Sequence, residues 1–155
     1  MTLEGKVVAV TGGTRGLGWG ISLALFRAGA NLALNSRSPA HGKEAPENLG
    51  APHRSLFVAG DVRQKADVEG FIDATIRRFG HIDVLVNNAG GAVATELVDQ
   101  TTDATWHDTI AWNLSSAFWA TRRALPSMLQ RQWGRIINIS GVLGKKGSGS
   151  VWRRT

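Results

Sequence analysis

Short apolar runs alternate along the chain with longer segments whose apolar residues recur at helical spacing. The first run, Lys6–Thr11 (KVVAVT), is rich in β-branched residues and precedes two glycines, which is typical of a buried strand. In Gly16–Ala28 the apolar residues fall on one face of a predicted helix, which ends at Gly29. Further strands are predicted at Asn31–Ser36, Ser55–Ala59 (SLFVA), Ile82–Val86 (IDVLV) and Arg135–Ser140 (RIINIS).

The helical pattern returns twice further along the chain. Ala66–Phe79 predicts one helix, and Thr102–Gln130 predicts two helices or one bent helix, in which we expect Pro126 to kink or loosen the last turns. The polar segment Arg37–Pro52 is rich in Pro and Gly and predicts a short helix at most. Strands that alternate with helices predict an α/β fold of the Rossmann type, a doubly wound parallel sheet of about five strands with helices on both faces.

The overall composition narrows the class of protein. A chain of 155 residues, 43% hydrophobic and 19% charged, fits one globular domain and excludes disordered, collagen-like and coiled-coil chains. No apolar run approaches the ~20 residues of a membrane span, and the N-terminus leaves no room for a signal peptide, so we expect a cytoplasmic protein without a membrane partner. With no cysteine and four isolated histidines, we expect no metal site.

The basic residues are unevenly distributed. Four of the 18 lie in the last eleven positions, so the net charge of +6 belongs mostly to this end and the rest of the chain is close to neutral. Nucleic-acid-binding proteins more often spread basic residues over a folded face among aromatic residues, so we expect no nucleic-acid partner. We interpret residues 1–144 as one domain and 145–155 as a basic, Gly/Ser-rich, disordered tail.

The segment Thr11–Gly18 (TGGTRGLG) joins a predicted strand to a predicted helix, as a dinucleotide-binding turn does. Its first glycine allows a tight turn, the next a close approach of the backbone to a pyrophosphate, and the last close packing of helix on sheet. Free N–H groups at the start of the helix would face the phosphates. The predicted cofactor-binding residues here are Gly12, Thr14, Arg15, Gly16, Leu17 and Gly18. The alternative is a glycine-rich turn without a ligand.

The end of the second predicted strand bears on the choice of cofactor. NAD-specific folds usually place a carboxylate there for the ribose 2′-hydroxyl, whereas this chain has Ser36 and Arg37, and its nearest acid is Glu44. Arg15 and Arg37 offer two guanidinium groups to a 2′-phosphate. We therefore predict NADP(H) in preference to NAD(H); the alternative is that both arginines are solvated loop residues.

These motifs together resemble the short-chain dehydrogenase/reductase family. The glycine spacing (T-G-x-x-x-G-x-G) is that of the family, and the similarity continues in family order over residues 4 to about 144. It includes Gly60-Asp61-Val62, Asn87-Asn88-Ala89-Gly90, Asn113-Leu114 and Gly134–Ser140 (GRIINIS). The resemblance implies the strand order 3-2-1-4-5 and an oxidoreductase that transfers hydride between a nicotinamide and a carbonyl or alcohol substrate.

The same resemblance assigns roles to individual residues. Asp61 and Val62 would hold the adenine ring, and Asn88, Ala89 and Gly90 would line the ribose on the nicotinamide side. Asn113 would bend its helix and hold a water in the proton relay. The residues themselves leave plainer alternatives: a turn at Asp61, a turn at Asn87–Asn88, and an exposed helix position at Asn113.

The catalytic part of the family pattern is incomplete. Family members use a tyrosine, a lysine four residues later and a serine, but this chain contains no tyrosine. In family register the tyrosine falls near Arg154 and the lysine beyond Thr155. Ser140 lies one residue before the position of the catalytic serine, which Gly141 occupies, and one residue along a strand reverses the side chain's direction. Our candidate catalytic residues are Asn113 and Ser140.

We therefore expect a short-chain oxidoreductase domain that lacks its last strands, as a truncated or frameshifted reading frame would, and that is catalytically incomplete as this chain. Two alternatives stay open, a non-catalytic NADP-binding module and an interaction fragment. The fragment would pair through the fifth strand, an apolar edge, or through the 102–130 helix, by which relatives form subunit interfaces and this chain could form a homo-oligomer.

Overall fold

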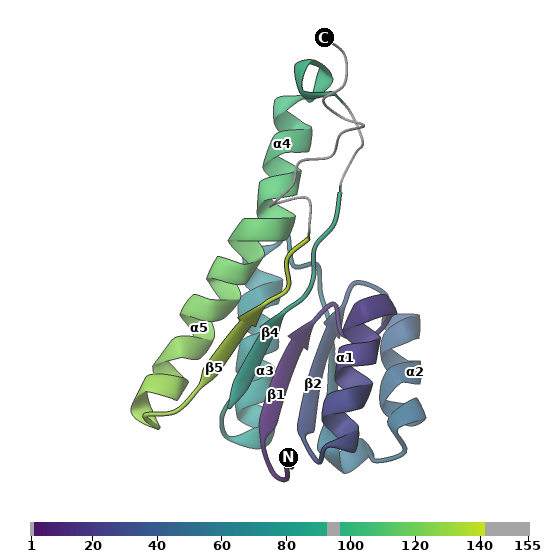
Figure 1. Ribbon diagram of the computed structural model, residues 1–155, viewed down its shortest axis with the longest axis vertical. Coiled ribbons are helices and arrows are strands. Elements are labelled where there is room, and N and C mark those ends of the chain that lie inside the picture. The colour runs from purple at the N-terminus through teal and green to yellow at the C-terminus, as the bar shows by residue number, and fades with distance from the viewer. Residues whose placement is uncertain (1, 93–96, 142–155) are drawn as a thin grey trace.

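Five parallel strands form one sheet in the computed structural model, which describes residues 2–92 and 97–141 (Figure 1). The order is β3-β2-β1-β4-β5 and every neighbouring pair is parallel, which confirms the predicted topology. The strands are β1 (Val7–Thr11), β2 (Asn31–Ser36), β3 (Ser55–Ala59), β4 (Val84–Asn87) and β5 (Arg135–Asn138). The predicted tail at 145–155 lies outside the described residues.

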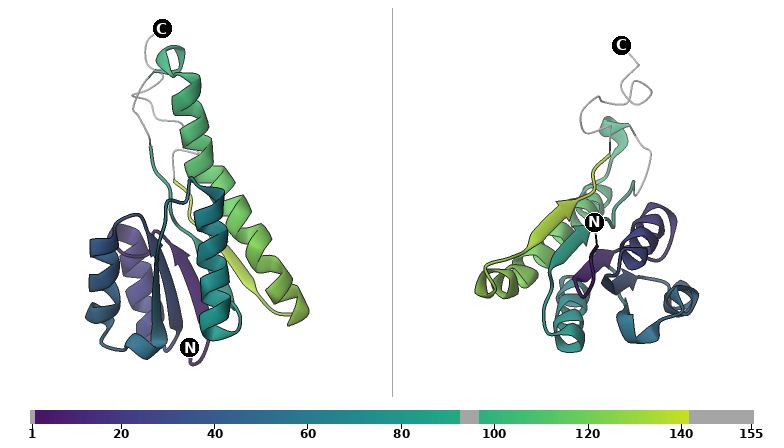
Figure 2. Two further views of the ribbon diagram at one scale, coloured as in Figure 1. Left: turned by 180° about the vertical axis from the view of Figure 1, so that it is seen from behind. Right: turned by 60° about the horizontal axis from the view of Figure 1, so that its bottom comes forward.

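Helices cover both faces of the sheet, as predicted (Figure 2). One face carries α1 (Gly16–Arg27) and α2 (Pro39–Leu49), and the other carries α3 (Lys65–Phe79) and α5 (Ser116–Gln130). The remaining elements are α4 (Asp103–Ile110), the short turns η1 (Pro52–Arg54) and η2 (Val98–Gln100), and η3 (Ala111–Ser115). None of the described helices is long and apolar enough to cross a membrane.

The helix α2 is longer than the short helix that the polar segment Arg37–Pro52 predicts. Its Ala45 and Leu49 are buried, and Gly42 lies so close to the ring of Phe57 on β3 that a Cβ atom there would overlap the ring. Packing of α2 on the sheet therefore outweighs the low helix propensity of its Gly and Pro residues.

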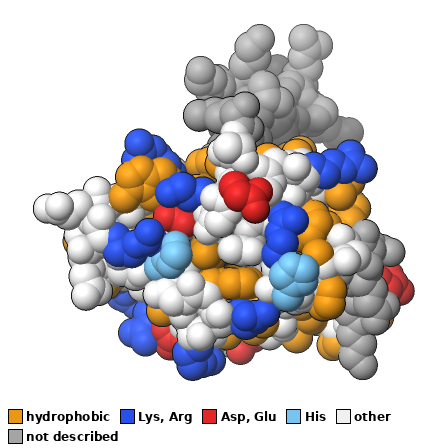
Figure 3. Space-filling model, turned by 90° about the horizontal axis from the view of Figure 1, so that it is seen from below, with side chains coloured by type: hydrophobic (Ala, Val, Ile, Leu, Met, Phe, Trp, Pro, Cys, Tyr) orange, Lys and Arg blue, Asp and Glu red, His pale blue; other side chains and the backbone are white. Residues whose placement is uncertain are grey.

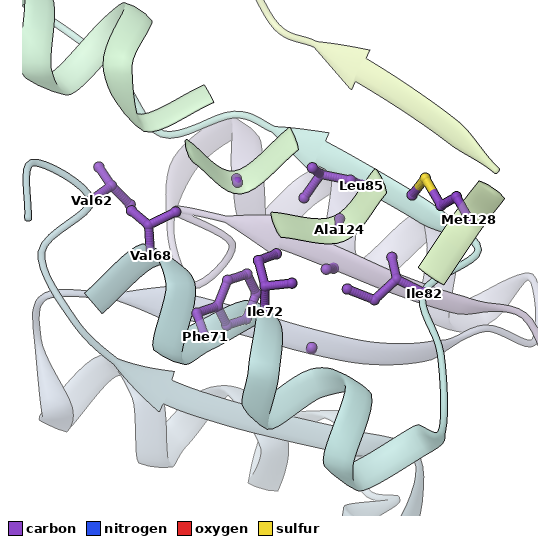
Figure 4. Packing of buried hydrophobic residues seen from close by; sticks show 11 residues of the cluster. Val62, Val68, Phe71, Ile72, Ile82, Leu85, Ala124 and Met128 are labelled. Atoms are coloured by element: carbon purple, nitrogen blue, oxygen red, sulfur yellow. The ribbon is translucent and has the colours of Figure 1, made fainter. Parts of the chain in front are cut away.

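The central strand β1 is buried on both faces, which explains its unbroken apolar run. Ala9 faces the cluster under α3 and α5, where Phe71, Ile72, Ile82 and Leu85 pack together (Figure 4). The neighbouring residues of β1 face the second cluster, under α1 and α2. Fully burying a large apolar side chain stabilises a fold by about 1.5–3 kcal/mol, so these two layers hold the carboxyl ends of the strands in fixed positions.

The predicted 102–130 helix consists of two α-helices joined by a π-helical turn. The Thr102 hydroxyl caps α4 by accepting a hydrogen bond from the Thr105 N–H at 3.1 Å. α4 then runs into the π-helical turn η3, and α5 continues through Pro126 to Gln130. The irregularity in the helix thus lies around Asn113, and α5 does not end at Pro126. A π-turn inserts one extra residue and is frequently found at functional sites.

The strand β5 forms an apolar edge, as predicted. It is the last strand of the sheet, and Ile137 and Ile139 are 45% and 37% exposed. Ile136, in contrast, is partly buried against the cluster under α3 and α5. One face of β5 is therefore covered by helices, and the other is open in the described part of the chain.

A buried carboxylate joins the amino ends of the strands. Asp83 is 1% exposed, accepts the Val7 N–H at 2.9 Å, and contacts Lys6, His81 and Arg131 through its two carboxylate oxygens. Figure 3 views this end from below, where lysine, arginine and histidine side chains lie among apolar ones. A buried charge needs such partners, so this cluster holds β1 and β4 in register at their amino ends.

Candidate functional site: a nucleotide cleft at the carboxyl ends of the strands

A cleft of about 760 Å³ lies at the carboxyl ends of the strands. The strand order reverses between β1 and β4, and such a switch point is where open α/β sheets bind ligands. The volume lies within the range of about 300–1,000 Å³ typical of small-molecule and cofactor sites. Every predicted cofactor-binding residue except Asp61 lines it: Gly12, Thr14, Arg15, Gly16, Leu17, Gly18, Ser36, Arg37, Val62, Asn88, Ala89 and Gly90.

The glycine-rich loop has the geometry that a phosphate-binding turn requires. Gly12 has a φ of +63°, which side-chain-bearing residues rarely adopt. Gly18 packs so tightly that a Cβ atom would overlap the Gly12 carbonyl oxygen. No side chain caps the start of α1, so the first-turn N–H groups remain available to a ligand. Among the described residues, the buried Thr14 hydroxyl also has no hydrogen-bond partner, which fits a loop built to surround a phosphate.

Asn88 fastens this loop to the end of β4. Its side-chain amide donates to the carbonyl oxygens of Thr11 and Gly12 at 3.0 and 3.2 Å. In return, the Thr11 hydroxyl accepts the backbone N–H groups of Asn88 and Ala89, both at 3.1 Å. These four bonds hold the two walls of the cleft at a fixed separation.

The neighbouring Asn87 points to the other side of the sheet. Its side-chain amide donates to Asn138 on β5 at 2.8 Å and to the Thr121 hydroxyl on α5 at 3.3 Å. The two adjacent asparagines therefore tie β4 to both of its neighbouring strands. They do more than form the plain turn that the sequence alone also allows.

The side of the cleft at the end of β2 is basic. Arg15 and Arg37 are both exposed and both line the cleft, together with Ser36. None of the described lining residues is acidic, and Glu44 is exposed on α2 outside the lining. This wall therefore offers two guanidinium groups and no carboxylate to an anionic ligand.

Asp61 lies outside the cleft lining, and its carboxylate binds Arg63. The Arg63 guanidinium donates from Nε and Nη2, the shortest bond being 2.7 Å, and the Arg63 N–H adds a backbone bond at 3.0 Å. These bonds, with smaller effects of the Arg63 and Arg37 charges, hold the pKa of Asp61 below its ordinary value although partial burial opposes them. Arg63 also reaches Asp108 on α4 at 3.2 Å. The predicted role of Asp61 in holding adenine stays a prediction.

Asn113 lies in η3, and its side chain binds the loop after β4. Its carbonyl oxygen accepts the Gly91 N–H at 2.9 Å, and its amide donates to the carbonyl oxygens of Gly91 and Thr109, both at 2.9 Å. The side chain therefore replaces helical hydrogen bonds where the helix widens. This anchors the π-helical turn to the loop after β4.

Ser140 lies in a second, smaller cleft of about 390 Å³ beside α5. Asn113 lines the same cleft with Phe118 and Thr121, so the structure brings the two candidate catalytic residues together. Ile139 lines both clefts and separates them. Ser140 is exposed and does not line the larger cleft.

The larger cleft also contains residues that the sequence did not indicate as part of the site. Trp112 contributes its indole, and Asn35, Ser38 and Gly60 complete the wall at the ends of β2 and β3. For Trp112, the available signal was its position beside Asn113 in the predicted helix. Among the described residues, no group of three His, Asp or Glu side chains is placed to hold a metal ion.

Comparisons with known proteins agree with this geometry. The model of the family described as short chain dehydrogenase matches residues 6–152. L-fucose dehydrogenase of Rattus norvegicus is 37% identical over 93% of this chain and 52% of its own length. D-beta-hydroxybutyrate dehydrogenase of Cupriavidus necator is 39% identical over 92% of this chain and 55% of its own length.

A solved structure is similar in fold as well as in sequence. The C-domain of a bacterial malonyl-CoA reductase, crystallised with NADP, gives a TM-score of 0.88 at 30% identity over 91% of this chain and 23% of that chain. The chain described here spans about half the length of the curated relatives it matches. It belongs to the short-chain dehydrogenase family.

Proposed function

We propose that this member of the short-chain dehydrogenase family binds NADP(H) in the cleft above β1, β2 and β4. The observation that carries the proposal is the meeting of the glycine-rich loop, the uncapped start of α1 and two arginines in one cleft. The broader activity of the whole protein would be hydride transfer between the nicotinamide and a carbonyl or alcohol. The names of the relatives, dehydrogenases of a sugar and of a hydroxy acid, support that reaction class.

The preference for NADP(H) rests on the wall at the end of β2. Arg37 and Arg15 would bind a 2′-phosphate through charge-assisted hydrogen bonds, and Ser36 would add a hydroxyl. A ribose 2′-hydroxyl would find no carboxylate among the described lining residues. The similar C-domain of malonyl-CoA reductase was crystallised with NADP, which supports the same choice.

Each wall of the cleft would bind one part of the dinucleotide. The first-turn N–H groups of α1 would bind the pyrophosphate, and the Thr14 hydroxyl lies beside them. Val62 would pack on the adenine ring, and Ala89 and Gly90 would face the ribose on the nicotinamide side. When bound, the cofactor supplies the hydride-transfer chemistry, and the residues of this chain hold and orient it.

We further propose that this chain binds the cofactor without completing catalysis. Hydride transfer builds negative charge on the substrate oxygen and needs a positioned acid, and the chain contains no tyrosine. Asn113 has its amide engaged with Gly91 and Thr109, and Ser140 lies in the smaller cleft, outside the lining of the larger one. A non-catalytic NADP-binding module is therefore the second candidate, and the missing tyrosine favours it. We also propose a cytoplasmic location for this protein.

The test of the cofactor proposal is calorimetric titration of the full chain with NADPH and with NADH. We expect tighter binding of NADPH, and Arg37→Ala should remove most of the difference, since each charge-assisted bond contributes about 1.5–3 kcal/mol at best and less when exposed. Arg77→Ala is the matched control, because Arg77 is also exposed but lies on α3 outside the cleft lining. Equal affinity for both dinucleotides, or an Arg37→Ala variant that binds NADPH like the unmodified chain, would refute the proposal.

We also propose that the outer face of α5 forms an interface between two copies of this chain. The exposed apolar residues Leu114, Phe118, Leu125 and Leu129 recur at helical spacing along one face of η3 and α5. Sedimentation velocity should record a dimer that Leu129→Glu weakens. Gln130→Glu introduces the same charge one residue further along and should leave the dimer intact. A chain that stays monomeric at high concentration would contradict this interface.

A further inference from the structure

Two cleft residues from distant parts of the chain contact each other. The guanidinium carbon of Arg37, after β2, lies 5.4 Å from the centroid of the Trp112 ring in η3. This distance is within the range of a cation–π contact. Both side chains line the larger cleft, so the contact closes across its end beside β2.

The indole is the fixed partner of this pair. Trp112 is partly buried against the cluster under α3 and α5. Its ring also lies against the backbone of Gly91, where an added Cβ atom would meet the ring at 3.1 Å. The adjacent Asn113 side chain binds both backbone groups of Gly91. The π-helical turn, the core and the loop after β4 therefore all hold the indole in place.

Arg37 is the movable partner. It is exposed, and no ion pair restrains it among the described residues. The pKa of Asp61 is lowered mainly by its hydrogen bond from Arg63, and the Arg37 charge adds only a small effect, so the Asp61 carboxylate is bound by Arg63 and does not restrain Arg37. A long flexible side chain loses rotamer freedom when it binds a ligand, and a contact that holds it beforehand reduces that loss.

We propose that Trp112 is a positioning residue that sets the cofactor preference by holding the Arg37 guanidinium at the point where the 2′-phosphate binds. The inference rests on the proposed function of the cleft as an NADP(H) site. The indole itself does not need to touch the phosphate, because it acts through Arg37. Its loss should therefore weaken the binding of NADPH more than that of NADH.

The experiment measures the affinities of the full chain for NADPH and NADH by calorimetry, in the unmodified protein and in Trp112→Leu and Trp112→Phe. Trp112→Leu should weaken NADPH binding by about two- to five-fold, the factor that corresponds to a solvent-exposed cation–π contact. NADH affinity should fall by less, so that the ratio of the two affinities changes, and circular dichroism reports that the variant is folded. Trp112→Phe keeps an aromatic face and should retain most of the NADPH affinity.

A double variant distinguishes an indole that positions Arg37 from an indole that contacts the cofactor directly. In Arg37→Ala, Trp112→Leu should have no additional effect on NADPH, since the two residues act together. An equal loss of NADPH and NADH affinity in Trp112→Leu, or no loss of either, would overturn the inference while the proposed function stands. An unmodified chain that binds neither dinucleotide would instead overturn the proposed function and this inference with it.

Discussion

The tight contact between α1 and the glycine-rich loop leads to a prediction about two glycines of α1, Gly18 and Gly20. A Cβ atom at Gly18 would overlap the Gly12 carbonyl oxygen and lie 3.0 Å from its carbon, and it would also meet the Asn88 side-chain amide. A Cβ atom at Gly20 would meet nothing within 4 Å. Substitution by alanine should therefore have opposite effects at the two positions, although both gain the same helix propensity.

The magnitudes follow from these contacts. Gly20→Ala should stabilise the fold by about 0.5–1 kcal/mol, because glycine is the poorer helix former. Gly18→Ala gains the same amount but overpacks a backbone contact, at a cost of about 1–3 kcal/mol. It also strains the two Asn88 bonds, each worth about 0.5–1.5 kcal/mol. The two variants should thus differ by about 2–5 kcal/mol, a large part of the ~5–15 kcal/mol of a typical domain.

Urea unfolding followed by circular dichroism measures this difference, and calorimetry with NADPH measures its effect on the cleft. Gly18→Ala should unfold at lower urea than the unmodified chain and lose NADPH affinity, because the loop that would hold the pyrophosphate is displaced. Gly20→Ala should unfold at higher urea and bind NADPH normally. A Gly18→Ala variant as stable as Gly20→Ala would refute the close packing of α1 on the loop.

Three further predictions concern the ion pair of Asp61 with Arg63, the hydrogen bonds of Asn113, and catalysis. Because the pKa of Asp61 is held below its ordinary value of 3.8, its ion pair with Arg63 stabilises the fold above that pH and is lost as the pH falls through the lowered pKa. The stability advantage of the unmodified chain over Asp61→Asn, from urea unfolding at several pH values, should therefore shrink in acid; a constant advantage would contradict this. Asn113→Ala should lower the free energy of unfolding by about 1–2 kcal/mol, since it leaves Gly91 without both partners, and an unchanged urea midpoint would argue against the anchor. The purified chain should not oxidise NADPH with a panel of carbonyl substrates, and turnover near ~10 s⁻¹ that Asn113→Ala abolishes would disprove the proposed catalytic incompleteness.

Much of the fold follows from local features of the sequence. The strands and most helices have apolar patterns that depend only on their own residues, and β2 and β3 have the predicted bounds. The glycine-rich loop is similarly local, since Gly12 and Gly18 satisfy steric requirements of one strand-turn-helix unit. The strand order and the family came from motifs in register, and the parallel sheet and the family model confirm both.

The tertiary structure decided the features that depend on partners distant in sequence. The length of α2 depends on burial of Ala45 and Leu49 against the sheet, which outweighs a weak local propensity. Arg37 lies over Trp112, because a long charged side chain contacts the partner that packing brings within reach. Sequence spacing contains no information on those distances. The sequence thus predicted the residues of the cofactor cleft, whereas their contacts with one another depend on how the fold brings β2, the loop after β4 and η3 together.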